Sequence, residues 1–166
     1  MREILFRGKR INSGQWVYGF YAKATMHWHK HGIHEDFIVC NAIQNGGYFN
    51  FLGRYAVDPK TIGQYTGLTD KNGTKIFEGD ILHFKAYRGG GFACPIGTDI
   101  YYRVLFGHCN PDMDTLSEYV GFWALGKDYD EDDLYECGNS INYLVDSHGA
   151  YVIGNIHDNP ELLKEE

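Results

Sequence analysis

Short runs in which apolar and polar residues alternate recur along the chain, and glycine-containing turns separate them. Alternation with a period of two predicts β-strands that bury one face. We expect such strands at residues 15–21, 37–42, 81–84, 100–106, 119–125 and 151–156. Near the end of the chain, Asn159 suits a helix N-cap and Pro160 the first helical position. The pattern therefore predicts a mainly β fold with a short C-terminal helix.

Turn residues and strand pattern are densest between Val57 and Phe84. Residues 70–73 (DKNG) and 78–80 (EGD) each predict a tight turn, because Asn and Gly accept positive φ at little cost. The corners of small barrels also need glycines where the chain bends sharply. We therefore predict a small, strongly bent SH3-like barrel, with packed sheets as the alternative architecture.

The segment GQYTGLTDKNGTKIFEGDIL, residues 63–82, resembles the YopX family of phage and prophage proteins. REILFRGK near the start and YVIGNIHDNPELL near the end support the resemblance, and their order and spacing fit the family. The resemblance implies a mostly β protein encoded by a phage, without an assigned biochemical activity. It supplies no catalytic residues to carry over, and residues 86–149 show no match.

Length and charge limit the classes of function. The chain has 166 residues, and this length predicts a single domain over residues 1–166. Its formal net charge of -7 argues against binding duplex nucleic acid over a broad face, because phosphate contacts need Lys and Arg. A local basic patch is still compatible with the positions of Arg2, Arg7, Lys9 and Arg10.

The cysteines and the N-terminal segment indicate a cellular compartment. The four cysteines form no CxxC pair, which favours free thiols in a reducing cytoplasm. The start of the chain lacks the apolar core of a signal peptide. No apolar run approaches the ~20 residues that a membrane-spanning helix needs. We expect a cytoplasmic protein of a bacterial host that does not interact with a membrane.

Histidines gather between residues 26 and 34. His27, His29 and His31 alternate, so on a strand they would project from one face, and His34 could supply a fourth metal ligand. The competing interpretation is a solvated segment whose histidines face water. We favour it, because the sequence identifies no carboxylate or carbonyl that would orient the imidazoles. We expect no cofactor, with a divalent metal at these histidines as the alternative.

Trp16, Tyr18 and Phe20 share one face of the strand expected at residues 15–21. The favoured interpretation is that this aromatic row packs in the core, as aromatic rows commonly do. The alternative is a platform on which single-stranded bases stack. In that case Trp16 and Tyr18 would be binding residues.

Three functions remain open. The first is a phage or prophage accessory protein, a non-enzymatic binding or assembly module whose partner is a protein, its own copies or single-stranded nucleic acid. The second is a metal-dependent hydrolase that uses the His27–His34 segment, with Glu35 or Asp36 as general base. The third is a structural subunit of an oligomer, in which Trp28 anchors an interface.

Overall fold

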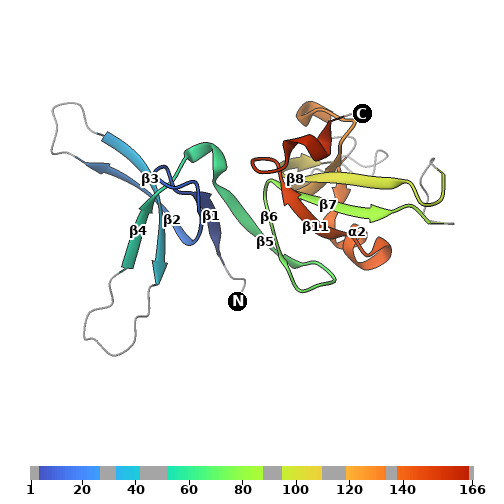
Figure 1. The fold of residues 1–166 in the computed structure, drawn as a ribbon, viewed down its shortest axis with the longest axis horizontal. Coiled ribbons are helices and arrows are strands. Elements are labelled where there is room, and N and C mark those ends of the chain that lie inside the picture. The colour runs from blue at the N-terminus through green and yellow to red at the C-terminus, as the bar shows by residue number, and fades with distance from the viewer. Residues whose placement is uncertain are drawn as a thin grey trace. The chain divides into compact units, whose positions relative to one another are not determined.

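The structure is a computed structural model, and it describes residues 4–26, 33–41, 52–87, 95–109, 119–133 and 138–164. The chain forms two compact units, Met1–Tyr65 and Thr66–Glu166. Figure 1 labels their helices and strands along the chain. Each unit is described by itself below.

The first unit is an antiparallel sheet. It contains β1 (Phe6–Lys9), β2 (Trp16–Met26), β3 (Ile33–Asn41) and β4 (Leu52–Ala56), which pair in the order β4-β3-β2-β1. A 3-10 helix, η1 (Pro59–Thr61), then leads to β5 (Gly63–Thr69). The first residues of β5 pair with β1, which extends the sheet by one strand.

This sheet curls around a small core. The residue after β1, Arg10, bridges to Val57, and the amide of Ile11 donates a hydrogen bond to the carbonyl of Ala56. The end of β4 therefore meets the chain that follows β1. Ile38 and Val57 are fully buried at the centre of the curl. A Cβ added at Gly8 would lie only 3.1 Å from that of Val57, so the absence of a side chain there makes room for the core.

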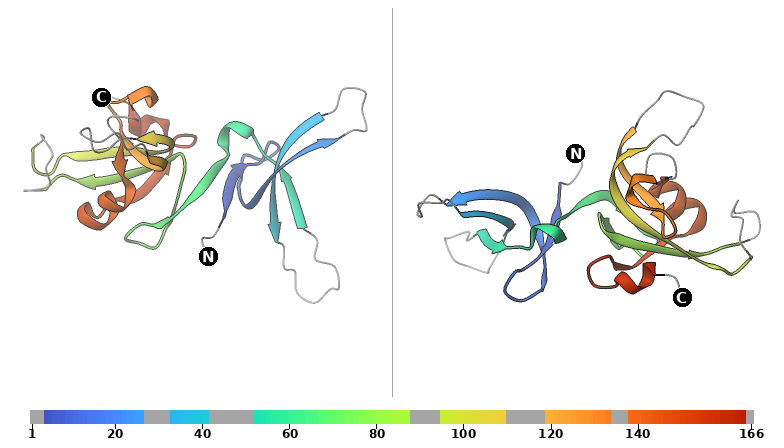
Figure 2. Two further views of the ribbon diagram at one scale, coloured as in Figure 1. Left: turned by 180° about the vertical axis from the view of Figure 1, so that it is seen from behind. Right: turned by 90° about the horizontal axis from the view of Figure 1, so that it is seen from above.

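The second unit is built on another antiparallel sheet, whose strands follow the order β10-β9-β8-β7-β11. These strands are β7 (Asp80–Lys85), β8 (Asp99–Cys109), β9 (Tyr119–Gly126), β10 (Asn139–Ser140) and β11 (Tyr151–Asn155). The unit also contains β6 (Lys75–Phe77), α2 (Ile141–His148) and two 3-10 helices, η2 (Glu131–Asp133) and η3 (Pro160–Leu163). Figure 2 shows the bend of this sheet and the position of α2 beside it.

One face of the second sheet forms the core with α2. Leu82 and Phe84 of β7 cluster with Val104 of β8 and with Ile141 and Leu144 of α2. Because successive strand residues point to opposite faces, His83 and Lys85 of β7 lie on the face that is turned away from α2. That face carries the polar network described below.

The prediction of a mainly β fold is confirmed as two antiparallel sheets. No closed barrel is found among the described residues, so the packed-sheet alternative fits better than the SH3-like barrel. Both turns of the central stretch are confirmed, with Gly73 and Gly79 at positive φ. The single-domain assignment to residues 1–166 stays a prediction.

The strand and helix ends differ from those expected. β2 continues to Met26 and β3 begins at Ile33, so this hairpin is longer than predicted. The short C-terminal helix is present, but as the 3-10 helix η3, and the side chain of Asn159 makes no capping bond. Its Oδ1 instead accepts a hydrogen bond from the amide of Asn155. Within the described ranges, no helix has the length and apolar character needed to cross a bilayer.

Candidate functional sites

The first candidate site is one face of β1 and β2, which we call the aromatic face. The antiparallel register places Arg7 opposite Tyr18 and Lys9 opposite Trp16, and residues paired in this way point to the same side of a sheet. Phe20 follows two residues after Tyr18 and lies on the same side. The aromatic face therefore consists of Arg7, Lys9, Trp16, Tyr18 and Phe20.

The interpretation that this row packs in the core is wrong for two of its three rings. Tyr18 is 49% exposed and Phe20 is 56% exposed, whereas Trp16 is partly buried. The reason lies in the other side of the sheet, where Ile38 and Val57 already fill the core of the small curled unit. The stacking-platform alternative for Trp16 and Tyr18 is not tested by this exposure and stays open.

Two cations accompany the rings of the aromatic face. Cζ of Arg7 lies 4.7 Å from the centroid of the Trp16 ring, and Nζ of Lys9 lies 5.5 Å from it. A cation at this distance from an indole ring is attracted by the negative face of the ring. Nearby, Cζ of Arg10 lies 4.5 Å from the ring centroid of Tyr55. Arg7 is only 6% exposed, whereas Lys9 is partly exposed, so Lys9 is the more accessible of the two charges beside the exposed rings.

The two units carry opposite net charges. Residues 1–65 contain eight Lys and Arg against four Asp and Glu, a formal net charge of +4. Residues 66–166 contain seven Lys and Arg against eighteen Asp and Glu, a formal net charge of -11. The overall formal charge of -7 is thus the sum of a basic first unit and a strongly acidic second unit. The aromatic face belongs to the basic unit.

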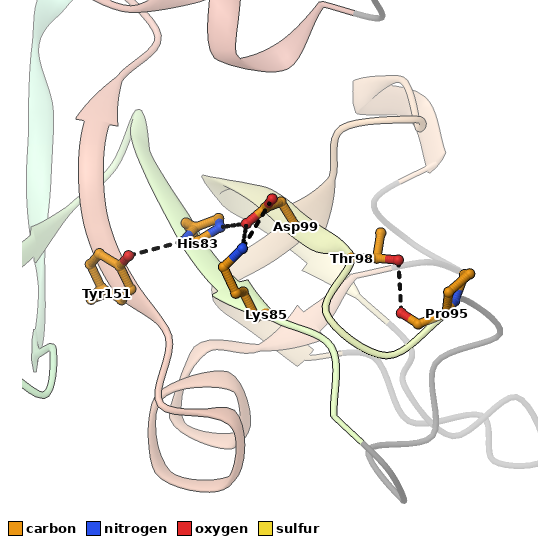
Figure 3. A network of polar contacts seen from close by, with 6 residues as sticks. All are labelled: His83, Lys85, Pro95, Thr98, Asp99 and Tyr151. Carbon is orange, nitrogen blue, oxygen red and sulfur yellow. Dashed lines mark hydrogen bonds and ion pairs between the residues drawn. The ribbon is translucent and has the colours of Figure 1, made fainter.

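The second candidate site lies in the other unit, on the face of the sheet that is turned away from α2. β7 pairs with β11 and β8 so that Tyr151, His83 and Tyr101 form one row across three strands. Nδ1 of His83 lies 3.2 Å from the hydroxyl oxygen of Tyr151, and its Nε2 lies 2.7 Å from Oδ1 of Asp99. Figure 3 shows His83 between these two partners. We call Tyr151, His83 and Asp99 the histidine network.

Hydrogen bonding favours the ionised form of Asp99, the acidic end of this network. The hydrogen bond from His83, followed by that from Lys85, keeps the pKa of Asp99 below its ordinary value. Nζ of Lys85 lies 3.1 Å from Oδ1 of Asp99. His83 is 8% exposed, whereas the side chain of Asp99 is 44% exposed. The network therefore runs from a nearly buried imidazole to the solvent.

Two further lysines flank the row of rings. Nζ of Lys71 lies 4.2 Å from the ring centroid of Tyr151. Nζ of Lys127 lies 5.8 Å from the ring centroid of Tyr101. Together with Lys85, they bring three positive charges to one face of a unit that is otherwise strongly acidic.

The predicted metal ligands are not brought together in what the structure describes. His27, His29 and His31 lie outside the described residues, as does Trp28. The backbone of His34 lies in β3 opposite Thr25, and its side chain is not described. In the described parts of the chain, no group of three or more His, Cys, Asp or Glu side chains is placed to hold a metal ion. The divalent-metal site stays a prediction.

Sequence reasoning missed the histidine network. Its members are 16 and 68 residues apart in the chain, and no spacing rule connects them. Pattern alone placed residues 81–84 on a strand, but only the register with two neighbouring strands shows which residues stand opposite His83. A polar residue within an apolar strand was the single feature that could have drawn attention to it.

Comparison with known proteins identifies the family. No curated protein matches the chain. The crystal structure of protein EF1440 from Enterococcus faecalis is similar over 99% of this chain and 100% of that chain, at 20% sequence identity and a TM-score of 0.45. The family model described as YopX protein matches residues 6–89, which is half of the chain and contains both the aromatic face and His83. The chain belongs to the YopX family.

Proposed function

We propose that the protein is a binding module whose aromatic face binds single-stranded nucleic acid. The observation that carries the proposal is the exposure of Tyr18 and Phe20 beside a tryptophan that two cations contact. Single exposed hydrophobic side chains are common, whereas neighbouring exposed rings on one face are a feature of interaction sites. Rings for stacking combined with positive charge for phosphates are the features of single-strand binders.

The spacing of the rings supports this ligand. Trp16, Tyr18 and Phe20 are alternate residues of one strand, so neighbouring rings are about 7 Å apart along it. An extended single strand can place successive bases on such a row, whereas the stacked bases of a duplex are not accessible to it. The formal net charge of +4 on residues 1–65 favours a polyanion at this unit, although the whole chain is acidic.

The resemblance to phage and prophage proteins supports a proposal about the setting of this activity. We propose a phage- or prophage-encoded accessory protein that acts in the cytoplasm of a bacterial host. Self-association and a protein partner remain compatible with the exposed face, because aromatic side chains also anchor protein interfaces. The experiment below separates these partners from nucleic acid.

Fluorescence anisotropy with a labelled oligothymidylate at low salt tests the proposal. We expect Tyr18→Ala and Phe20→Ala each to weaken binding by about 5- to 150-fold, because stacking of one base on an aromatic ring contributes about 1–3 kcal/mol. Trp16→Ala is a poorer choice, since it also removes the ring that Arg7 and Lys9 contact. The matched control is Phe106→Ala, because this phenylalanine of the second unit is 54% exposed.

Salt provides a second measurement in the same assay. The logarithm of the association constant falls linearly with the logarithm of the salt concentration. Lys9→Gln should make this slope shallower by about 0.7 if Lys9 contacts one phosphate of a single strand. A flat titration of the unmodified protein would reject nucleic acid as the ligand. An equal loss of affinity in Phe106→Ala would reject the aromatic face as the binding site. The aromatic face would then be assigned to a protein partner or to self-association.

A further inference from the structure

The histidine network lies in the other unit and is independent of the aromatic face. We propose that Tyr151 is a nucleophile activated by His83, and that its substrate is a phosphate ester. In this assignment Tyr151 and His83 are catalytic residues, while Asp99 is a positioning residue that acts through His83. Figure 3 shows the three side chains in line, with Lys85 beside Asp99.

Hydrogen bonding determines the direction in which a proton can move. The ionised carboxylate of Asp99 can only accept, so Nε2 of His83 carries the hydrogen and donates it over 2.7 Å. When the ring carries this single hydrogen, Nδ1 is an acceptor, and it lies 3.2 Å from the hydroxyl oxygen of Tyr151. This is the arrangement of a nucleophile, a base and an orienting acid, with a phenol in the place of an alcohol.

The fold holds the base rigidly. His83 is nearly buried in the middle strand of three, and rings on both neighbouring strands contact it. The ring centroid of Tyr101 lies 5.1 Å away, and that of Tyr151 lies 5.4 Å away in an edge-on arrangement. Rotation of the imidazole would break both hydrogen bonds, so the geometry is maintained between reaction cycles.

The lysines around Tyr151 determine the substrate class. Lys71 lies against the ring of Tyr151, and Lys85 stands on the far side of His83 next to Asp99. Both side chains are exposed and therefore accessible to a ligand. Lys85 is paired with Asp99, so Lys71 is the cation beside the phenol, and in a unit with a formal net charge of -11 it favours an anionic substrate at Tyr151. A phosphate ester combines such a charge with an electrophilic centre.

The chemical step balances without a redox partner. The hydroxyl oxygen of Tyr151 forms a bond to phosphorus, and the bond from phosphorus to the leaving oxygen breaks. The phenolic proton passes to Nδ1 of His83, and Asp99 stabilises the imidazolium that results. The leaving alkoxide takes a proton from water. Lys71 stabilises the negative charge that develops on the phenolate and phosphate oxygens.

Reactivity of Tyr151 toward a neutral aryl sulfonyl fluoride tests the activation directly. The reagent forms a sulfonate ester with a nucleophilic phenol, and peptide mass spectrometry gives a rate for each tyrosine of the full chain. We expect Tyr151 to react faster than Tyr143 and Tyr87, although these are 51% and 45% exposed. His83→Gln should reduce the Tyr151 rate by about tenfold or more, since general bases contribute 10²–10⁴.

Variants of Asp99 separate catalysis from a structural role. The side chain of Asp99 is 44% exposed and lies at the edge of the network, so its substitution should leave the unit folded. Asp99→Asn should slow labelling of Tyr151, Asp99→Glu should restore part of the rate, and the control tyrosines should be unchanged. If Tyr151 reacts no faster than Tyr143, or if its rate is unaffected by Asp99→Asn, the proposed activation is wrong and the network is structural.

Inorganic phosphate tests the substrate class. It should protect Tyr151 from labelling in the unmodified protein. Lys71→Gln should weaken that protection when each protein is compared with its own labelling rate in the absence of phosphate. Absence of protection at millimolar phosphate would overturn the assignment to phosphate esters.

Discussion

At the scale of single residues, Asp70 connects parts of the second unit that are far apart in sequence. Its Oδ1 accepts hydrogen bonds from the amides of Asn72 and Thr74 within the β5–β6 turn. Its Oδ2 accepts one from the amide of Val152 in β11. Burial alone would raise the pKa of Asp70, but these backbone bonds outweigh it and hold the pKa below its ordinary value.

Asp70→Asn should destabilise the second unit by about 1.5–3 kcal/mol, the range for hydrogen bonds to charged groups. The side-chain amide of Asn has the same shape, but it carries a donor NH₂ group where Asp has its second acceptor oxygen. At least one of the three part-buried backbone N–H groups therefore loses its hydrogen-bond acceptor. Urea unfolding at pH 7 measures the change. Asp58→Asn is the control, because Asp58 is exposed and its side chain accepts a hydrogen bond from the amide of Lys60.

The same carboxylate makes stability depend on pH. Its pKa is lower in the folded state, so the unfolded chain binds the proton first and acid favours unfolding. The unfolded pKa of Asp is about 3.9, so the contribution of Asp70 to stability is complete at pH values well above about 4. It is lost as the pH falls through the lower pKa of the folded state. The unfolding free energy of Asp70→Asn should decline less between pH 5 and pH 3 than that of the unmodified protein.

At the scale of elements, Gly19 allows β2 and β3 to approach closely at the bend of the first sheet. A Cβ added at Gly19 would lie 2.1 Å from the carbonyl oxygen of Val39 and 3.1 Å from Cγ2 of Ile38. The first of these atoms belongs to the backbone, so it cannot rotate away. This glycine inside a strand therefore marks a close approach of two strands and not a turn.

Gly19→Ala should therefore cost about 1–3 kcal/mol or more, because the two strands must separate to admit the methyl group. Gly121→Ala is a matched control in β9, where the nearest atom to an added Cβ, Nε1 of Trp123, is 4.0 Å away. Thermal unfolding followed by circular dichroism compares the two. Equal stability of both variants would show that the strands of the first unit do not approach as described.

At the scale of the whole molecule, the two units have separate cores and opposite charges. Ile38 and Val57 are buried in the first, and the cluster around Leu82 and Leu144 is buried in the second. Separate cores permit separate opening, since the free energy of local unfolding depends mainly on contacts within a cooperative segment.

Hydrogen exchange of the two stability variants tests this separation. Gly19→Ala should raise amide exchange in peptides from residues 1–65 and leave those from residues 66–166 unchanged. Asp70→Asn should have the reverse effect, because the backbone amides of Asn72, Thr74 and Val152, which donate to this carboxylate, lie in the second unit. If either variant increases exchange throughout the chain, the units unfold together, and the prediction of one domain is supported.

Local chemistry explains why much of the fold could be predicted. The turns at Gly73 and Gly79 depend on positive φ, which glycine adopts wherever it occurs in a chain. The strands that begin near Tyr119 and Tyr151 follow from alternation over five or more residues. The end of β2 at Met26 was missed, because pairing with β3 extends a strand beyond its own pattern.

The candidate sites could be predicted only in part, because they depend on the position of the core and on the register between strands. The row of Trp16, Tyr18 and Phe20 was predicted to share one face, because side chains alternate along any strand. Whether that face is buried or exposed depends on which side the core occupies, and composition does not decide this. The neighbours of His83 depend on the register of β7 with two other strands, which is set by the packing of the unit as a whole.

Mainly β structure, its glycine turns and the YopX family therefore follow from the order of residues alone, because φ preferences and alternation act over a few neighbouring positions. Tertiary structure decided that Tyr18 and Phe20 of the aromatic face are exposed, that basic and acidic residues divide between two units, and that Tyr151, His83 and Asp99 meet. These outcomes depend on contacts between residues distant in the chain, which are formed only when whole strands pair and bury a common core.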